Sequence, residues 1–276
     1  MKKKILSATT AVIALMALSA CAPSVPSVPS TEETTSVAAP TEIAIATKEI
    51  TTITGLKIPV KGIQNDGKGE YLQTTISDSD PVMTVDQSVV EPTATGQWSP
   101  AEISDANKMV IKFIAEEAID STLSGGNPDD KANTQKWIDT HSPLFAPNQK
   151  ASLIADVWDN DPNKPIVFRG QFRDEKYGLV HGKDVTHVAD RKIKVNRIVG
   201  GSLDDGTKAI GVEADVQFSL NTDFQPSAGK LSDTGKSAAV VESTNATISY
   251  TLVKGAKGEW LISGFYSTFT TVPVVE

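Results

Sequence analysis

The chain has 276 residues, one cysteine and a formal net charge of −8 at pH 7. This acidic excess argues against a nucleic-acid-binding protein and against flat binding to anionic lipid head groups. Because Cys21 is the only cysteine, no internal disulfide can form, which excludes a disulfide-stapled scaffold.

The N-terminal segment has the organisation of a bacterial export signal. Lys2, Lys3 and Lys4 precede an uncharged, mostly apolar run over 5–18, which is short for a membrane span. The run ends in LSAC at 18–21, which resembles the lipobox of bacterial lipoproteins. That resemblance implies cleavage after residue 20, lipidation of Cys21 and attachment to the cell membrane, outside the cytoplasm. The alternative is a free thiol beside an ordinary signal peptide.

Residues 22–46 are rich in proline, serine, threonine, alanine and glutamate. Such a composition buries too little apolar surface to offset the entropy lost on ordering. We therefore expect residues 21–46 to comprise the lipidated cysteine and a disordered tether. A flexible coil of this length spans roughly 25–30 Å, which would hold the rest of the chain away from the membrane.

Residues 47–98 predict a small β-rich region that packs on the main domain. The segments EITTITGLKIPV at 49–60 and YLQTTI at 71–76 are rich in β-branched residues, as strands are. Asn65-Asp66-Gly67 lies between them and has the composition of a tight turn.

A long amphipathic helix is expected over 99–123. Ser99 and Glu102 have the spacing of a capping box at its start, and a glycine-rich segment follows its end. Two shorter helices are expected, one from about 130 to 140 and one that starts near 147. All three precede the main run of strands.

The C-terminal half alternates between apolar and polar residues. Strands are expected over 165–172, 190–199, 209–221, 245–253 and 258–270. The third alternates most clearly, and its apolar residues all point one way: Ile210, Val212, Ala214, Val216, Phe218 and Leu220. One apolar face and one polar face are typical of an antiparallel sheet that is covered by helices on one side.

Helices followed by antiparallel strands predict an α+β fold. The pattern over 103–270 resembles the cone-shaped fold of the nuclear transport factor two-like superfamily, with the closing hairpin SYTLVKGAKGEWLISGF as its last strand pair. This resemblance implies N-terminal helices packed on a curved antiparallel sheet over 99–276. The superfamily contains isomerases, dehydratases, cyclases and inert binding domains, so the fold leaves activity open. The chain also resembles actinobacterial lipoproteins that carry FIAEEAIDS-like helices. This second resemblance does not indicate which activity the protein has.

Sequence motifs for catalysis or cofactor binding are absent, and we expect no cofactor. No G-x-S-x-G, P-loop or G-x-G-x-x-G pattern occurs. DNDPN at 159–163 lacks the later glycine and glutamate of a calcium loop. His181 and His187 could face each other across a hairpin, but only Asp184 or Asp190 is close in sequence as a further ligand. We interpret them as surface histidines and predict no metal site.

The segment FIAEEAIDS at 113–121 places adjacent glutamates inside an apolar helix. On a wheel of 100° per residue, Glu117 lies on the apolar stripe, seven residues after Val110, whereas Glu116 lies to the side. Asp120 lies near the edge of the stripe. We therefore expect Glu117 to be buried and Glu116 to be solvated.

A buried carboxylate is costly unless it is paired. Strand parity places Arg191 and Arg197 on the core-facing side, so we expect Glu117 to pair with one of them and lock helix to sheet. In a second interpretation these charges line a pocket for a small polar or anionic ligand. In a third, Glu117 or Asp120 is a general acid or base, although a neighbouring arginine lowers a carboxylate pKa and counts against that role.

The export signal, the tether and the lack of a catalytic constellation favour a non-enzymatic binding or interaction protein, anchored to the membrane through Cys21. Its expected partners are the membrane and an envelope protein or small ligand. An isomerase- or cyclase-like enzyme with a carboxylate in the cone pocket is the first alternative. A structural protein of the cell envelope is the second.

Overall fold

The structure is a computed structural model that describes residues 48–52, 55–125, 130–159, 165–169, 177–224 and 239–272. These residues belong to one compact unit, Ile45–Glu276. The expected signal peptide, Cys21 and the tether lie outside the described residues. Among the helices that are described, none is long and apolar enough to cross a membrane.

Three strands form a small antiparallel sheet in the order β1-β2-β3: β1 (Lys48–Thr51), β2 (Lys57–Asn65) and β3 (Glu70–Thr74). The segment at 49–60, expected as one strand, is divided between β1 and β2. The turn expected at 65–67 is confirmed between β2 and β3. Gly67 has a φ of 90°, a conformation that glycine adopts without steric cost.

The helical elements follow the small sheet in the chain: η1 (Pro81–Met83), η2 (Gln87–Val89), α1 (Pro92–Thr95), α2 (Pro100–Phe113), the π turn η3 (Ile114–Ala118), α3 (Lys131–His141), η4 (Ser142–Leu144) and α4 (Lys150–Asp159). The capping box is confirmed, since Ser99 Oγ accepts the N–H of Glu102 and the Glu102 carboxylate accepts the N–H of Ser99. The long helix expected over 99–123 is wrong at its end, because the regular α-helix stops at Phe113.

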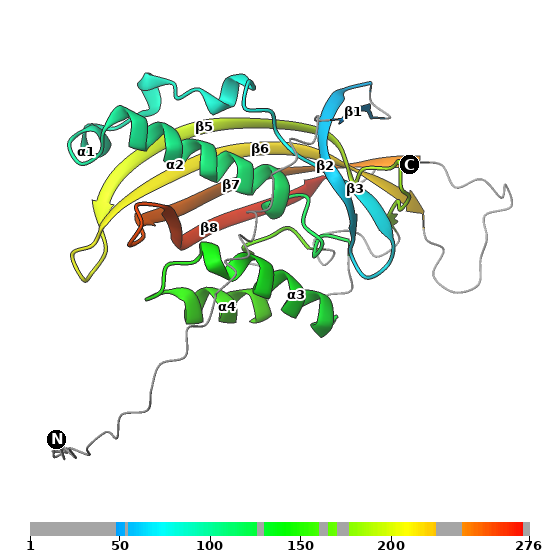
Figure 1. Cartoon of the computed structure of the whole chain (residues 1–276). Helices are drawn as coiled ribbons and strands as arrows, with labels where there is room; N and C mark the ends of the chain where they lie inside the picture. Colours follow the sequence, from blue (N-terminus) through cyan, green and yellow to red (C-terminus); the bar gives the residue numbers. More distant parts are fainter. Residues whose placement is uncertain are drawn as a thin grey trace, which may run out of the picture. The chain divides into compact units, whose positions relative to one another are not determined.

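Five strands form the large antiparallel sheet: β4 (Tyr177–Leu179), β5 (Val188–Ser202), β6 (Lys208–Phe224), β7 (Ala239–Lys254) and β8 (Trp260–Val272). β6, β7 and β8 pair in chain order, and β4 and β5 both pair with β6. The strand expected at 165–172 is wrong in its described part, because residues 165–169 form no strand. Figure 1 shows the four long strands as a strongly curled sheet.

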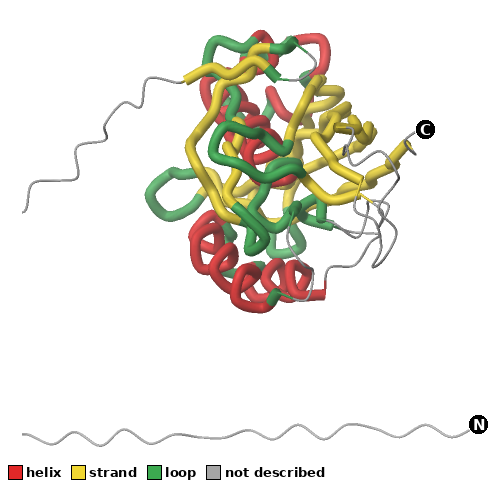
Figure 2. Tube along the Cα trace, turned by 90° about the vertical axis from the view of Figure 1, so that its right-hand side faces the viewer, coloured by secondary structure: helices red, strands yellow, loops and turns green. Residues whose placement is uncertain are grey.

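The alternation expected in β6 is confirmed, since its six apolar side chains are all buried. They join one hydrophobic cluster with residues of α2, α3, α4 and the small sheet, such as Ile111, Trp137, Val157 and Ile58. The β-rich region therefore shares its core with the rest of the described chain. In Figure 2, helical segments lie between the strands of the small sheet and those of the large sheet.

The α+β class and the curled antiparallel sheet are thus confirmed. α2 lies across β5 and β6, and α4 and η4 lie beside β8 (Figure 1). An isolated bridge between Phe145 and Ile262 joins the segment after η4 to β8. This arrangement places the segment at 113–121 between the two sheets, where its carboxylates meet side chains from both.

Candidate functional site

The predicted site segment forms a π turn rather than a regular helix. The N–H of Ile119 donates to the carbonyl of Ile114, five residues earlier, at 3.2 Å. A π turn holds one residue more than an α turn and is often found at functional positions. The added residue rotates the following side chains, so Asp120, expected at the edge of the apolar stripe, is fully buried.

The π turn leaves backbone carbonyls that other segments bind. The Gln73 side chain donates from β3 to the carbonyls of Glu116 and Asp120 at 2.7 and 3.1 Å. The hydroxyl of Tyr71 also donates to the carbonyl of Asp120, at 3.2 Å. The N–H of Phe168 donates to the carbonyl of Ala118 at 2.6 Å. Side chains of the small sheet thereby donate hydrogen bonds to backbone carbonyls that an irregular helix end leaves free inside the protein.

Glu117 is buried as predicted, with 6% of its surface exposed. Its carboxylate accepts the indole N–H of Trp137 at 3.0 Å, lies 3.1 Å from Nε2 of His141 and lies 3.4 Å from Nζ of Lys61. Burial raises the pKa of Glu117, but the hydrogen bond and charge of His141, the charge of Lys61 and the hydrogen bond of Trp137 outweigh it. The pKa of Glu117 is therefore lowered, and the carboxylate is held in its ionised form.

The predicted pairing of Glu117 with Arg191 or Arg197 is wrong: neither arginine pairs with Glu117 in the described structure. Arg197 fails because of a β-bulge. The register shifts between Val195 and Arg197, so Asn196 is an extra residue that reverses the inward-outward order. Arg197 is consequently exposed and pairs with Glu91 at the surface.

Arg191 points toward the helix end, but it binds backbone rather than Glu117. Its guanidinium donates to the carbonyls of Thr75 at 2.5 Å and Ala115 at 3.3 Å, and to Oγ1 of Thr74 at 3.4 Å. Burial lowers the pKa of Arg191, and the negative charge of Asp120 opposes that change. The expected lock between helix and sheet therefore exists, with backbone carbonyls in place of a carboxylate.

Asp120 is a fully buried carboxylate with an altered pKa. Its Oδ2 accepts both the N–H and the hydroxyl of Thr74 at 2.6 Å. Burial raises the pKa of Asp120 to about 7, against the lowering effects of Thr74 and of the Arg191 charge. Such a pKa suits acid–base chemistry. However, Asp120 is fully buried and lines none of the three cavities described below.

Glu116, expected to be solvated, is partly buried instead. Its carboxylate lies 2.8 Å from Nζ of Lys61 and accepts the hydroxyl of Thr75 at 2.6 Å. Lys61 therefore contacts both adjacent glutamates. The cation beside Glu117, which was expected to be an arginine of the large sheet, is a lysine of the small sheet. Lys61 is 56 residues from Glu117 in the chain, so neither spacing nor motif pointed to it.

The interpretation of both histidines as surface residues is wrong for His187, which is fully buried. Its ring stacks on Tyr71 with 3.6 Å between centroids and an interplanar angle of 10°. His181 is partly exposed, and its Nε2 lies 2.9 Å from Oδ2 of Asp66. The nearest carboxylate to His181 thus comes from the β2–β3 turn, rather than from Asp184 or Asp190.

The largest of the three cavities, about 470 Å³, lies between the η1–η2 segment, α2 and β5. Its walls are mainly apolar, and it is lined by Pro81, Val82, Thr84, Val85, Asp86, Ser88, Val89, Asn107, Ile193, Lys194, Val195 and Ile198. Asn107 is fully buried, and its Oδ1 accepts no hydrogen bond in the described structure, while its Nδ2 donates to the carbonyl of Val82. A buried acceptor without a donor is a costly feature in an apolar wall.

A smaller groove of about 220 Å³ lies beside Glu117. It is lined by Lys61, Met109, Lys112, Phe113, Glu116, Glu117, His141 and Leu144. Both glutamates already pair with Lys61, and Glu117 also pairs with His141, so the carboxylates of this groove have partners within the protein. The pocket predicted around Glu117 therefore exists as a shallow groove rather than as the deep cavity of the domain.

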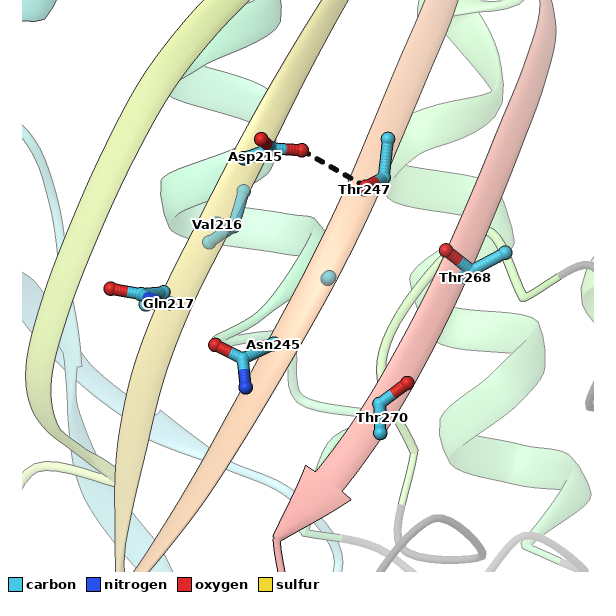
Figure 3. A pocket seen from close by; sticks show the side chains of 8 residues that line it. Asp215, Val216, Gln217, Asn245, Thr247, Thr268 and Thr270 are labelled. Carbon is cyan, nitrogen blue, oxygen red and sulfur yellow. Dashed lines mark hydrogen bonds between the residues drawn. The ribbon is translucent and has the colours of Figure 1, made fainter.

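The third cavity, about 270 Å³, lies over the polar residues of β6, β7 and β8, on the side of the sheet away from the helices. Figure 3 shows Asp215 hydrogen-bonded to Thr247, with Gln217, Asn245, Thr268 and Thr270 around them. This cavity is open and has no buried polar group aimed into it. It matches the polar face that alternation predicted for these strands.

The chain matches no protein-family model, and no curated protein or solved structure is significantly similar to it.

Proposed function

We propose that this protein is a lipid-anchored, extracytoplasmic binding protein that holds a small ligand in the cavity between α2 and β5. The carrying observation is the largely apolar cavity itself, whose lining includes the buried Asn107, a side chain whose Oδ1 accepts no hydrogen bond in the described structure. A binding pocket typically combines apolar walls with a few placed polar groups, and about 470 Å³ is within the range that holds a drug-sized molecule.

The lining residues indicate the chemistry of the ligand. Val85, Val89, Ile193 and Val195 offer apolar surface, so most of the ligand would be apolar. We infer that a hydroxyl or N–H donor on the ligand reaches Oδ1 of Asn107, which accepts no hydrogen bond in the described structure. We accordingly propose a small, mainly apolar molecule with one hydrogen-bond donor, in a cone-like domain of the nuclear transport factor two-like type.

An enzyme and a structural envelope protein are the alternatives. The pKa of about 7 at Asp120 favours the enzyme, but Asp120 would have to become accessible from a cavity before it could act on a substrate. A structural role would leave the cavity between α2 and β5 without a ligand. Ligand binding in that cavity therefore separates the main proposal from the structural one.

Dye binding tests the cavity. Residues 21–276 carrying Cys21→Ser would be titrated with 1-anilinonaphthalene-8-sulfonate, a mainly aromatic, anionic dye with an N–H donor. We expect saturable fluorescence at one dye per chain. Val195→Trp, which fills the cavity, is expected to weaken binding at least tenfold. Asn107→Leu is expected to weaken it about fivefold, since one neutral hydrogen bond contributes about 1 kcal/mol.

Thr268→Trp is the matched control, because it fills the cavity on the other side of the sheet. It should leave dye affinity unchanged. Unchanged affinity in Val195→Trp, or loss of binding in Thr268→Trp, would place the dye elsewhere and contradict the proposed site. Urea unfolding of each variant checks that the domain remains folded during the titration.

Membrane attachment gives a separate prediction. Cys21→Ser removes the only cysteine in the chain, and with it the proposed acylation site. Because two or more acyl chains are needed for stable anchoring, the variant is expected to move from the membrane pellet to the soluble fraction after cell lysis. Ser19→Ala, which keeps the small residues before the cysteine, is the control and should stay in the pellet. A Cys21→Ser protein that still sediments with membranes would refute the anchor.

A further inference from the structure

Metal-ligating side chains from three separate segments meet beside the two sheets. Asp66 lies in the turn between β2 and β3, His181 follows β4, and His187 immediately precedes β5. One ligand atom of each residue lies within 4.8 Å of the other two. The described structure therefore contains a cluster of two imidazoles and one carboxylate, although these residues are up to 121 positions apart (187 − 66).

The turn directs one oxygen of Asp66 toward the histidines. Oδ1 accepts the N–H groups of Lys68 at 2.9 Å and Gly69 at 3.0 Å, so the backbone of the turn occupies it. Oδ2 faces the histidines and lies 2.9 Å from Nε2 of His181. Asp66 is fully buried, and its second oxygen is thus held in place for a cation.

A glycine allows the chain to pass close to this cluster. A Cβ at Gly125 would lie 1.9 Å from Oδ2 of Asp66 and 3.1 Å from Cε1 of His187. Any larger residue would displace the carboxylate from its present position. The backbone after the π turn therefore lies against Asp66 and His187 on one side of the cluster.

A carboxylate lies near the ring of His187, at a distance longer than a hydrogen bond. Its Nδ1 lies 4.0 Å from Oδ1 of Asp120, and its ring is held against Tyr71. Histidines that bind metals commonly donate their other ring N–H to a carboxylate, which fixes the ring orientation. The side chain of His181 is 23% exposed, so the cluster has one side open to solvent.

The chemistry of the three ligand side chains favours some metal ions over others. Calcium and magnesium prefer oxygen ligands only, whereas two imidazoles with one carboxylate suit zinc or another divalent transition metal. Zinc takes such ligands at about 2.0–2.2 Å in tetrahedral geometry, which places ligand atoms roughly 3.4 Å apart. Atoms that lie within 4.8 Å of one another reach this spacing through a contraction of about 1.4 Å at most.

We propose that Asp66, His181 and His187 bind one divalent transition-metal ion, zinc in the first place, with water as the fourth ligand on the exposed side. The ion joins the turn of the small sheet to the start of β5 and so fastens the β-rich region to the large sheet. The site is separate from the cavity between α2 and β5, because the two share no lining residue.

Zinc titration of the full chain after treatment with a chelator tests the proposal. Calorimetry is expected to show one Zn²⁺ per chain, and Zn²⁺ is expected to raise the unfolding temperature. Asp66→Asn and His181→Asn are each expected to weaken binding at least 100-fold. Asp66→Asn keeps an oxygen for the N–H groups of Lys68 and Gly69, so the turn is preserved. Asp120→Asn is expected to weaken binding about tenfold, as the loss of a carboxylate behind a ligand does.

His141→Asn is the matched control, since His141 also faces a carboxylate but lies outside the cluster. Its zinc affinity should equal that of the parent chain. Absence of zinc binding in the parent, or parent-like affinity in His181→Asn, would overturn the proposal. Circular dichroism checks folding, and if Asp66→Asn does not fold, the partly exposed His181 decides the outcome alone. The dye titration should be unchanged in His181→Asn, which keeps this test independent of the proposed ligand cavity.

Discussion

Arg191→Met is expected to lower the free energy of unfolding by about 2–3 kcal/mol. The guanidinium donates to the carbonyls of Thr75 and Ala115, and methionine leaves both acceptors without that donor. The substitution also removes the positive charge nearest to the buried Asp120. Methionine retains most of the apolar stem, so the loss reports on the polar head rather than on packing.

Arg197→Met is the matched control on the same strand. Arg197 pairs with Glu91 at the surface, and 52% of its side chain is exposed. Because solvent screens an exposed ion pair, urea unfolding should show a much smaller change for Arg197→Met than for Arg191→Met. Without the bulge, the alternation of the strand would place both arginines on the same face. Equal losses of stability in the two variants would therefore contradict the placement of Arg191 toward the core and Arg197 at the surface.

Glu117→Gln is expected to cost about 2–3 kcal/mol at pH 7. Glutamine can still accept the indole N–H of Trp137, but it removes the charge that faces His141 and Lys61. Glu116→Gln changes an identical group one residue away. Because the side chain of Glu116 is more exposed than that of Glu117, 15% against 8%, we expect a smaller loss of about 1 kcal/mol.

The effect of Glu117→Gln should depend on pH in a defined direction. The pKa of Glu117 in the folded protein lies below its ordinary value of 4.5. Such a carboxylate contributes stability above the unfolded pKa and loses that contribution as pH falls through the folded pKa. The difference between parent and variant should therefore be largest at neutral pH and shrink below pH 4.5. A difference that grows toward acid would show that the folded pKa is raised instead.

The ionised state of Glu117 also bears on function. A general acid at neutral pH needs a carboxyl pKa raised toward 7, and the partners of Glu117 lower it. Its neighbours are a lysine, a histidine and a tryptophan that hold the π turn against β2 and α3. These contacts indicate a structural role for Glu117. The cavity that Asn107 lines is therefore the better candidate for a ligand site.

Local patterns in the sequence were enough to predict several features of the regular helices and strands. Alternation in β6 correctly predicted which side chains are buried, because each strand residue reverses direction and only one face meets the helices. The capping box predicted the start of α2, since its hydrogen bonds join residues three apart. The buried position of Glu117 also followed from periodicity, because the helix is regular as far as Phe113.

Periodic patterns failed wherever one extra residue enters an element. The π turn rotates Asp120 into the core, and the bulge at Asn196 turns Arg197 to the surface. Each extra residue changes which of the following side chains face the core, but it need not be of any particular type. Neither insertion can therefore be recognised from the residue types in the sequence. The predicted pairing of Glu117 with Arg197 was wrong for this reason. Arg191 does face the helix end, but its guanidinium binds backbone carbonyls and Thr74 instead of Glu117.

The sequence by itself determined the α+β class, the buried face of β6, the turn at Asp66 and the burial of Glu117, because each depends on residues close together in the chain. Only the tertiary structure decided the partners: Lys61 and His141 beside Glu117, and Asp66 beside His181 and His187. Side chains that meet across two sheets are brought together by packing of the common core. That packing depends on the whole chain, and no local spacing encodes it.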